Sequence, residues 1–151
     1  MKSIKLFFSY SHKDEELRDE LAKQLVLLKR QGFIEDWHDR TIDPGDDWRQ
    51  AIERELNRAD IILLLVSPDF LASNFCYDRE MLRAVERHEA GDAAVIPIIL
   101  RPSDNWEAAP FGKLQALPVN RVPITRWTDQ DEAFANVAAG IRRVVGKLLN
   151  P

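Results

Sequence analysis

The sequence is poor in several features that mark common functional classes. It holds one cysteine, Cys76, so no disulfide can form within the chain, and a lone cysteine is typical of a reducing compartment. The six glycines never fall into a G-x-G-x-x-G or Walker pattern, which argues against the glycine loops that cradle nucleotide phosphates. These shortages favour a cytoplasmic protein without a Rossmann or P-loop site.

The sequence also lacks an excess of positive charge and long apolar runs. The formal net charge is -4, whereas nucleic-acid binders carry a concentrated basic excess. The longest wholly apolar run, residues 61–66, is far shorter than the roughly 20 residues of a membrane-spanning helix. The start turns acidic after a brief apolar run and does not resemble a signal peptide. We therefore expect neither a nucleic-acid nor a membrane partner.

Ligands for a resident metal are few. The only soft candidates are Cys76, His12, His38 and His88, and none are paired at a metal-ligand spacing. The sequence predicts no metal site and no cofactor.

Hydrophobic residues make up 45% of the 151 residues, which is enough for one compact domain with a full core. The chain is too short for a second domain of ordinary size. Short apolar runs alternate with segments of helical periodicity. Strands are predicted at residues 2–9, 33–37, 61–66, 93–100 and 122–124, and helices at 11–32, 46–57, around Glu80 to Gly91, and 131–149. This alternation predicts an α/β fold: a five-stranded parallel sheet of order 2-1-3-4-5, with helices on both faces.

Three local signals refine this prediction. Ser11 and Asp14 have the spacing of a capping box at the start of the first helix, with Asp in place of the usual Glu. Pro44-Gly45 indicates a turn before the second helix. Pro97 cannot donate to a β-ladder, so the fourth strand is expected to lie towards an edge of the sheet or to carry an irregularity at this residue.

Open α/β sheets bind ligands at the carboxyl ends of their strands, at the point where the strand order reverses. Here that point lies between strands 1 and 3. Ser9, Tyr10 and Ser11 follow strand 1, and the segment from Ser67 that leads to Glu80 follows strand 3. We expect both segments to line a crevice, with the loop at residues 39–47 close enough to cover it.

Helical periodicity leaves the role of Glu80 open. Met81, Leu82 and Val85 form the expected core-facing stripe, and Glu80 lies at its edge. Arg83, three residues later, offers an ordinary surface ion pair instead of a functional role. Asp78 is a weaker candidate for a functional acid.

Cys76 and the tryptophans have alternatives of their own. Cys76 near His12 has the residue types of a nucleophile and its base, although a small buried cysteine packed under a helix is the more common situation. Trp37 and Trp48 are expected to pack, but an aromatic ring beside the crevice could also stack on a purine.

Five segments together, in order and spanning nearly the whole chain, resemble the Toll/interleukin-1 receptor (TIR) domain family, particularly its bacterial members. They are "KLFFSYSHKDE", "DWHDRTIDPGDDW" (the BB loop of the family), "LLLVSPDFLASNFCYDREM", "VIPIILRP" and "APFGKLQALP". The resemblance implies a flavodoxin-like fold and one of two functions. Many bacterial and plant members cleave NAD+ at the nicotinamide–ribose bond, whereas animal receptors and adaptors mostly act as non-catalytic assembly modules.

By this resemblance Glu80 matches the catalytic glutamate. Counting from Phe75 as in animal receptors reaches Arg79, and the bacterial register, one residue longer, reaches Glu80; Asp78 is the fallback. The resemblance also implies that Ser9, Tyr10, Ser11 and Cys76 line the substrate site, and that Asp39 and Arg40 hold ribose or phosphate groups of NAD+. It further implies self-association through the BB loop, a role in bacterial immune or cell-death signalling, and a single TIR domain at residues 1–151 that is commonly fused to a sensor region.

Overall fold

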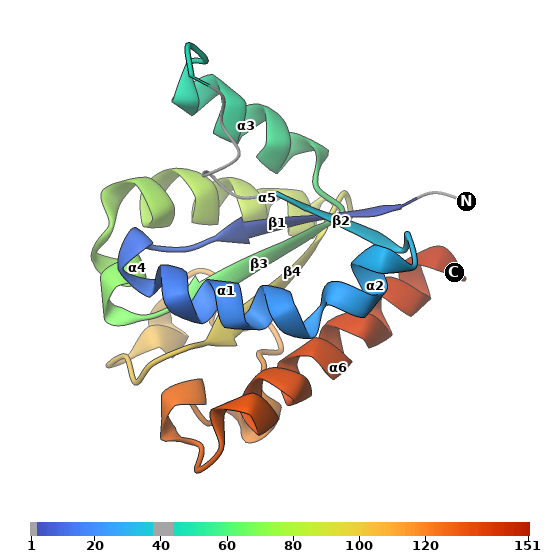
Figure 1. Ribbon diagram of the computed structural model, residues 1–151. Helices are drawn as coiled ribbons and strands as arrows, with labels where there is room; N and C mark the ends of the chain where they lie inside the picture. Colours follow the sequence, from blue (N-terminus) through green and yellow to red (C-terminus); the bar gives the residue numbers. More distant parts are fainter. Residues whose placement is uncertain (1–2, 38–43) are drawn as a thin grey trace.

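The computed structural model describes residues 3–37 and 44–151, and they form a parallel sheet between two layers of helices (Figure 1). The strands are β1 (Ile4–Ser9), β2 (Ile34–Trp37), β3 (Ile61–Val66) and β4 (Ala94–Ile99). Their order is β2-β1-β3-β4, and all three pairings are parallel. The α/β class, the parallel sheet and the order of these four strands are confirmed.

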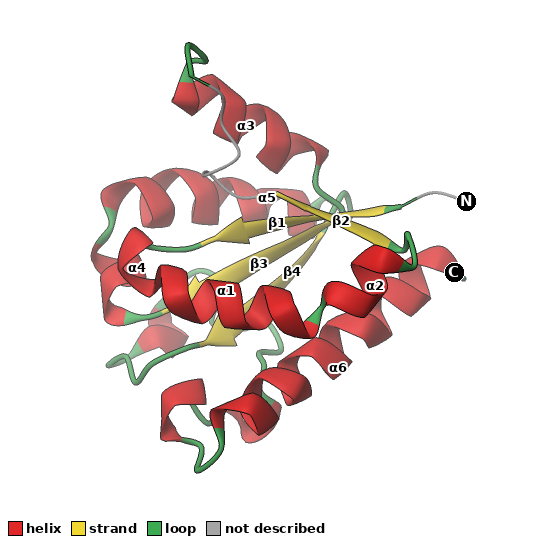
Figure 2. Cartoon of the chain, in the orientation of Figure 1, coloured by secondary structure: helices red, strands yellow, loops and turns green. Residues whose placement is uncertain are grey.

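Helices cover both faces of the sheet (Figures 1 and 2). On one face lie α1 (Glu15–Gln24), α2 (Val26–Arg30) and α6 (Gln130–Leu149); on the other lie α3 (Trp48–Arg58) and α5 (Leu82–Glu89), while α4 (Pro68–Ala72) sits near the carboxyl ends of the strands. Alternate strand residues point into two hydrophobic cores, Leu63 into the core with α1 and α6, and Leu64 into the core with α3 and α5. This two-sided burial explains the unbroken apolar sequence of β3, whose six residues are all buried.

The fifth strand expected at residues 122–124 is absent from the part of the chain that the structure describes. This stretch instead joins two 3-10 turns, Val119–Arg121 and Ile124–Arg126. Pro118 and Pro123 precede the two turns, and because proline lacks an N–H group it cannot donate to a β-ladder. The apolar pattern "RVPI" therefore reflects the burial of Ile124 in the core rather than strand pairing.

One residue of the preceding loop does reach the sheet. Leu117 forms a single bridge with Ile98, donating its N–H to the Pro97 carbonyl at 2.9 Å and accepting from the Ile99 N–H at 2.9 Å. The Pro97 carbonyl points towards Leu117, on the side of β4 away from β3. Because N and C=O of one strand residue point to the same side, the proline nitrogen also points away from β3. The expectation that β4 lies at an edge is confirmed.

The first predicted helix is divided into three pieces. A 3-10 turn, His12–Asp14, precedes α1, and a break at Leu25 separates α1 from α2. The Ser11 hydroxyl accepts from the Lys13 N–H at 3.3 Å, so Ser11 is a cap as predicted. The capping-box role of Asp14 is wrong, because its buried carboxylate bonds Ser67 and Arg101 instead.

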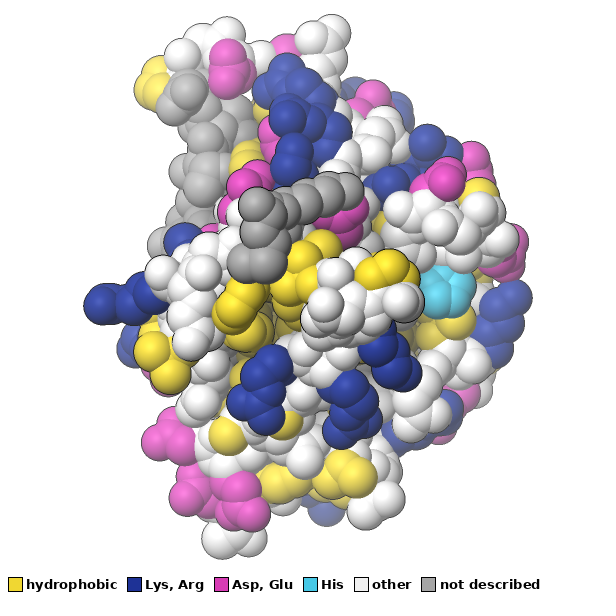
Figure 3. All heavy atoms as spheres, turned by 90° about the vertical axis from the view of Figure 1, so that its right-hand side faces the viewer, with side chains coloured by type: hydrophobic (Ala, Val, Ile, Leu, Met, Phe, Trp, Pro, Cys, Tyr) yellow, Lys and Arg dark blue, Asp and Glu magenta, His cyan; other side chains and the backbone are white. Residues whose placement is uncertain are grey.

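The edge at which the strands begin is held by bonds between side chains and backbone. Buried Arg87 donates to the carbonyls of Leu56 at 2.8 Å, Ala59 at 2.7 Å and Asp92 at 3.1 Å. The Asp60 carboxylate accepts from the Lys5 N–H at 2.9 Å. Figure 3 looks onto this edge, where Lys and Arg side chains are spread across the surface.

No helix within residues 3–37 and 44–151 has the length and hydrophobicity to span a bilayer. The longest of these helices, α6, is amphipathic, with Phe134, Val137 and Ile141 in the core.

Candidate active site

A pocket of about 550 Å³ lies at the carboxyl end of β1, within the range of small-molecule sites. Its position is the one expected from the reversal of strand order between β1 and β3. The residues that line it come from β1 and the turn after it, from α3, and from the segment after α4: Phe8, Tyr10, Ser11, His12, Lys13, Trp48, Ile52, Ser73, Cys76 and Glu80.

Glu80 is a buried carboxylate at the wall of this pocket. Its exposed fraction is 6%, and its Oε2 accepts a hydrogen bond of 3.0 Å from the Ser9 hydroxyl. Ser9 is the last residue of β1 and is itself fully buried. Burial of a carboxylate is costly unless hydrogen bonds compensate. A buried acid beside a pocket is therefore more typical of a catalytic site than of an ordinary surface.

The helix that carries Glu80 explains why periodicity misplaced it. Phe75–Met81 is a π-helix, whose i→i+5 bonds hold one more residue per turn than an α-helix. The extra residue rotates the buried face, so Glu80 turns inward and Leu82, expected in the core, is 47% exposed. Arg83, the expected surface partner, bonds Asn57 at 2.7 Å and Glu86 at 2.6 Å.

The neighbouring charged residues of this π-helix face outward. Asp78 is exposed and does not line the pocket at β1, and Arg79 is exposed and bonds Glu53 at 2.6 Å. The sequence left Asp78, Arg79 and Glu80 as candidates for the position of the catalytic acid. Of these three, only Glu80 lines this pocket.

Cys76 lies in the same wall, four residues before Glu80. Its thiol donates to the Tyr10 carbonyl at 3.3 Å, and its backbone N–H donates to the Ser73 hydroxyl at 3.2 Å. The side chain is 7% exposed and belongs to the core beneath α3 and α5. These contacts describe a packed, hydrogen-bonded thiol, although His12 lines the same pocket.

Another part of the lining is the turn after β1, which carries Ser11, His12 and Lys13. His12 and Lys13 are exposed, so they bring basic groups to the pocket. Trp48, at the first position of α3, is 49% exposed and lines the same pocket. The sequence analysis considered His12 and Trp48 but missed Lys13. Extending the predicted lining segment after strand 1 by two residues would have found it.

Part of the predicted substrate site lies outside the described residues. Asp39 and Arg40 fall there, as does most of the BB loop. Of that loop, the structure describes Pro44-Gly45, where Gly45 has the positive φ of 92° that a turn tolerates in glycine. Asp47 caps α3, accepting from Arg49 N–H at 3.1 Å and Gln50 N–H at 3.3 Å.

Among the residues described, which leave out His38 and Asp39, no three His, Cys, Asp or Glu side chains are grouped so as to hold a metal ion.

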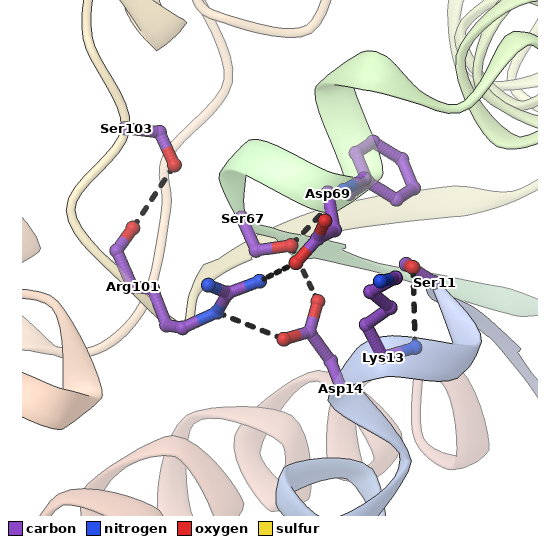
Figure 4. Close-up of polar contacts among 8 residues, drawn as sticks. Ser11, Lys13, Asp14, Ser67, Asp69, Arg101 and Ser103 are labelled. Carbon is purple, nitrogen blue, oxygen red and sulfur yellow. Dashed lines mark hydrogen bonds and ion pairs between the residues drawn. The ribbon is translucent and has the colours of Figure 1, made fainter.

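A polar cluster behind the turn was not foreseen (Figure 4). Asp14, 2% exposed, accepts from the Ser67 hydroxyl through Oδ2 and from Arg101 Nε at 2.9 Å through Oδ1. Arg101 also donates to Asp69. Burial disfavours the charge on Arg101, but hydrogen bonds and attraction from Asp69 and Asp14 outweigh it and raise the pKa of the guanidinium. The sequence holds one sign of this cluster: Ser67 and Arg101 each follow a strand, so both could be expected at the carboxyl edge of the sheet.

Solved structures share this fold. The TIR domain of the Toll-related receptor TRR-2 from Hydra magnipapillata superposes with a TM-score of 0.61 at 22% identity, covering 91% of this chain and 97% of that one. The TIR domains of the activated Roq1 resistosome, which directly recognises the pathogen effector XopQ, superpose with a TM-score of 0.51 at 19% identity, covering 64% of this chain and 57% of that chain. At these identities the likeness shows the fold alone.

Curated relatives add sequence similarity. The protein y4lF of Sinorhizobium fredii (strain NBRC 101917 / NGR234) is 60% identical over 95% of this chain and 44% of its own length. Toll-like receptor 13 of Mus musculus is 27% identical over 93% of this chain and 14% of its length, and the 2' cyclic ADP-D-ribose synthase BtTIR of Bacteroides thetaiotaomicron is 28% identical over 60% and 31%. The chain thus spans less than half the length of these relatives.

The sequence model of the TIR domain matches residues 6–138. This match runs from β1 into α6 and includes the pocket, the π-helix and Glu80. With the parallel sheet and the strand order described above, it shows that the chain belongs to the TIR domain family.

Proposed function

We propose that this TIR domain cleaves NAD+ at the nicotinamide–ribose bond, with Glu80 as the catalytic carboxylate. The observation that supports it most is the burial of Glu80 at 6% exposure, hydrogen-bonded to Ser9, in the wall of a pocket of about 550 Å³. A relative named as a cyclic ADP-ribose synthase adds support at 28% identity.

The chemistry suits a pocket with one acid. When the C–N glycosidic bond breaks, its electron pair goes to the pyridinium nitrogen and nicotinamide leaves as a neutral molecule, so the leaving group needs no proton. The ribose left behind resembles an oxocarbenium ion, which a carboxylate hydrogen-bonded to ribose hydroxyls stabilises. Water then adds to give ADP-ribose and a proton, or a hydroxyl of the same molecule adds to give a cyclic ADP-ribose and a proton.

The other groups at the pocket fit the rest of NAD+. Lys13 and His12 at the rim would face the pyrophosphate, and the half-exposed ring of Trp48 would stack on a base. Ser9 would keep Glu80 in place, while Tyr10, Ser11 and Cys76 shape the pocket. NAD+ is the substrate, and this scheme uses no further cofactor. The lone cysteine fits a cytoplasmic location.

Self-association belongs to the same proposal, with the BB loop as a contact between copies. We expect nicotinamide release to rise more steeply than in proportion to protein concentration, because the active form is an assembly. A role in immune or cell-death signalling would follow from such switching, with the trigger supplied by a part of the protein outside this domain.

A non-catalytic interaction module is the second candidate, favoured by the match to Toll-like receptor 13 over 93% of this chain. Measurement of nicotinamide release from NAD+ by the concentrated or artificially oligomerised protein separates the two. Absence of turnover under every assembly condition would favour the interaction module.

The test of the site is Glu80→Gln, compared with Asp78→Asn. Loss of one stabilising group at a developing charge reduces kcat by about 100-fold or more, and the Gln side chain keeps the shape of the buried acid. Asp78 lies two residues away on the same π-helix but is exposed and outside the pocket, so its variant should match the wild-type rate. Equal turnover by Glu80→Gln and wild type would refute the role of Glu80.

A further inference from the structure

The cluster of Asp14, Ser67, Asp69 and Arg101 connects three segments that leave the carboxyl edge of the sheet (Figure 4). Asp14 ends the turn after β1, Ser67 follows β3, and Arg101 comes shortly after β4. Ser67 is fully used, because its hydroxyl donates to Asp14 and accepts from the Phe70 N–H at 3.0 Å as the cap of α4. The bonds are thus directed across elements rather than along one.

Asp14 is the buried centre of this cluster. Its side chain is 1% exposed, against 31% for Arg101 and 37% for Asp69. Both of its carboxylate oxygens have a donor, so the ion pair at Asp14 is held by hydrogen bonds to charged groups, which are stronger than neutral ones. The carboxylate therefore fixes the position of the backbone that carries it.

That backbone is one wall of the pocket. Asp14 is the last residue of the 3-10 turn, and its N–H donates to the Ser11 carbonyl at 2.8 Å. This bond closes the turn that contains Ser11, His12 and Lys13, all of which line the pocket. Glu80, in contrast, lies on the π-helix and is hydrogen-bonded to Ser9.

We propose that Asp14 is a positioning residue, whose carboxylate, held by Ser67 and Arg101, sets the wall of residues 11–13 against the bound substrate. Its kinetic part rests on the proposed NAD+ cleavage. Since residues 11–13 and Glu80 lie on different elements, we expect loss of the Asp14 carboxylate to weaken substrate binding and to leave the chemical step intact.

The test compares Asp14→Asn with Arg87→Gln in two measurements. Arg87 is also a buried polar residue that joins several segments, but at the opposite edge of the sheet. Asp14→Asn should raise the KM for NAD+ about ten-fold with kcat changed less than about two-fold. Arg87→Gln should lower the melting temperature and leave both constants of the folded enzyme unchanged.

The second measurement needs no turnover. Amide hydrogen exchange of the peptide that covers residues 10–17 should be faster in Asp14→Asn, and exchange of residues 82–89 should not change. If wild-type protein releases no nicotinamide, the proposed function fails, and the exchange pattern alone decides whether Asp14 fixes the wall.

A milder variant covers the case in which Asp14→Asn does not fold. Arg101→Gln leaves the bond between Asp14 and Ser67 in place, and it should raise KM and exchange in the same direction, with Arg101→Lys restoring part of the loss. An unchanged KM in these variants, or a fall of kcat equal to the effect on KM, would overturn the positioning role. Unchanged exchange of residues 10–17 would overturn it as well.

Discussion

The two edges of the sheet use polar side chains in different ways. Where the strands begin, Arg87 and Asp60 bond backbone groups at the ends of helices and strands. Where the strands end, the two buried carboxylates bond other side chains, Glu80 with Ser9 and Asp14 with Ser67 and Arg101.

This difference separates groups that complete the fold from groups that shape a site. Backbone carbonyls at the end of a helix have no partner within the helix, so Arg87 satisfies atoms that any sequence with this fold would expose. The bonds described for Glu80 and Asp14 go to other side chains, and burial of a carboxylate by itself costs stability. Two buried carboxylates at one edge therefore indicate selection for a function of that edge.

The largest effect on stability is expected from Arg87→Gln. Its loss leaves the carbonyls of Leu56, Ala59 and Asp92 without this donor, so the free energy of unfolding should fall by about 2–3 kcal/mol. Urea denaturation followed by circular dichroism measures it. A loss below about 0.5 kcal/mol, in the range of ordinary surface substitutions, would show that the two edges do not differ as described.

Ser9→Ala should have an intermediate effect, on turnover rather than stability. Without the hydroxyl, Glu80 loses a hydrogen bond of 3.0 Å and its fixed orientation, so kcat for nicotinamide release should fall about ten-fold.

Ser3→Ala is the matched control near the opposite end of the same strand, because the Ser3 hydroxyl donates to the Gly32 carbonyl at 3.0 Å. Its kcat should equal that of the wild type. Similar losses in the two serine variants would place the effect on folding instead of on Glu80.

The smallest effect is expected from Cys76→Ser. The serine hydroxyl can still donate to the Tyr10 carbonyl and fill most of the same space, so turnover should change by less than about three-fold. A rate measured with NAD+ decides the matter. Abolished activity, together with a normal melting temperature, would make the thiol the nucleophile and contradict the scheme proposed for Glu80.

Much of the fold could be predicted because it depends on patterns local to the sequence. The run at β3 predicted a buried central strand, and Pro97 predicted the edge position of β4. The fifth strand failed because an apolar stretch such as "RVPI" is equally suited to a buried turn when prolines precede it. The break in the first helix at Leu25 has no signal in the sequence that we recognise.

The candidate site was less accessible to prediction, since it depends on contacts between distant segments. Periodicity put Glu80 at the edge of the core stripe and Leu82 inside it, whereas the structure buries the first and exposes the second. The reversal of strand order put this segment beside the crevice, and the register of the family then selected Glu80. Asp14 was assigned to local capping because its partners, Ser67 and Arg101, lie 53 and 87 residues away.

The π-helix at Phe75–Met81 has a consequence for how this chain is aligned with its relatives. A relative whose helix is α-helical throughout reaches the same depth in the pocket with one residue fewer, because each π-type bond spans one more residue. The gap in such an alignment belongs inside the helix, between Phe75 and Glu80, although gaps are normally placed in loops. An alignment without a gap there would pair the acid of such a relative with Arg79 and leave Glu80 unmatched.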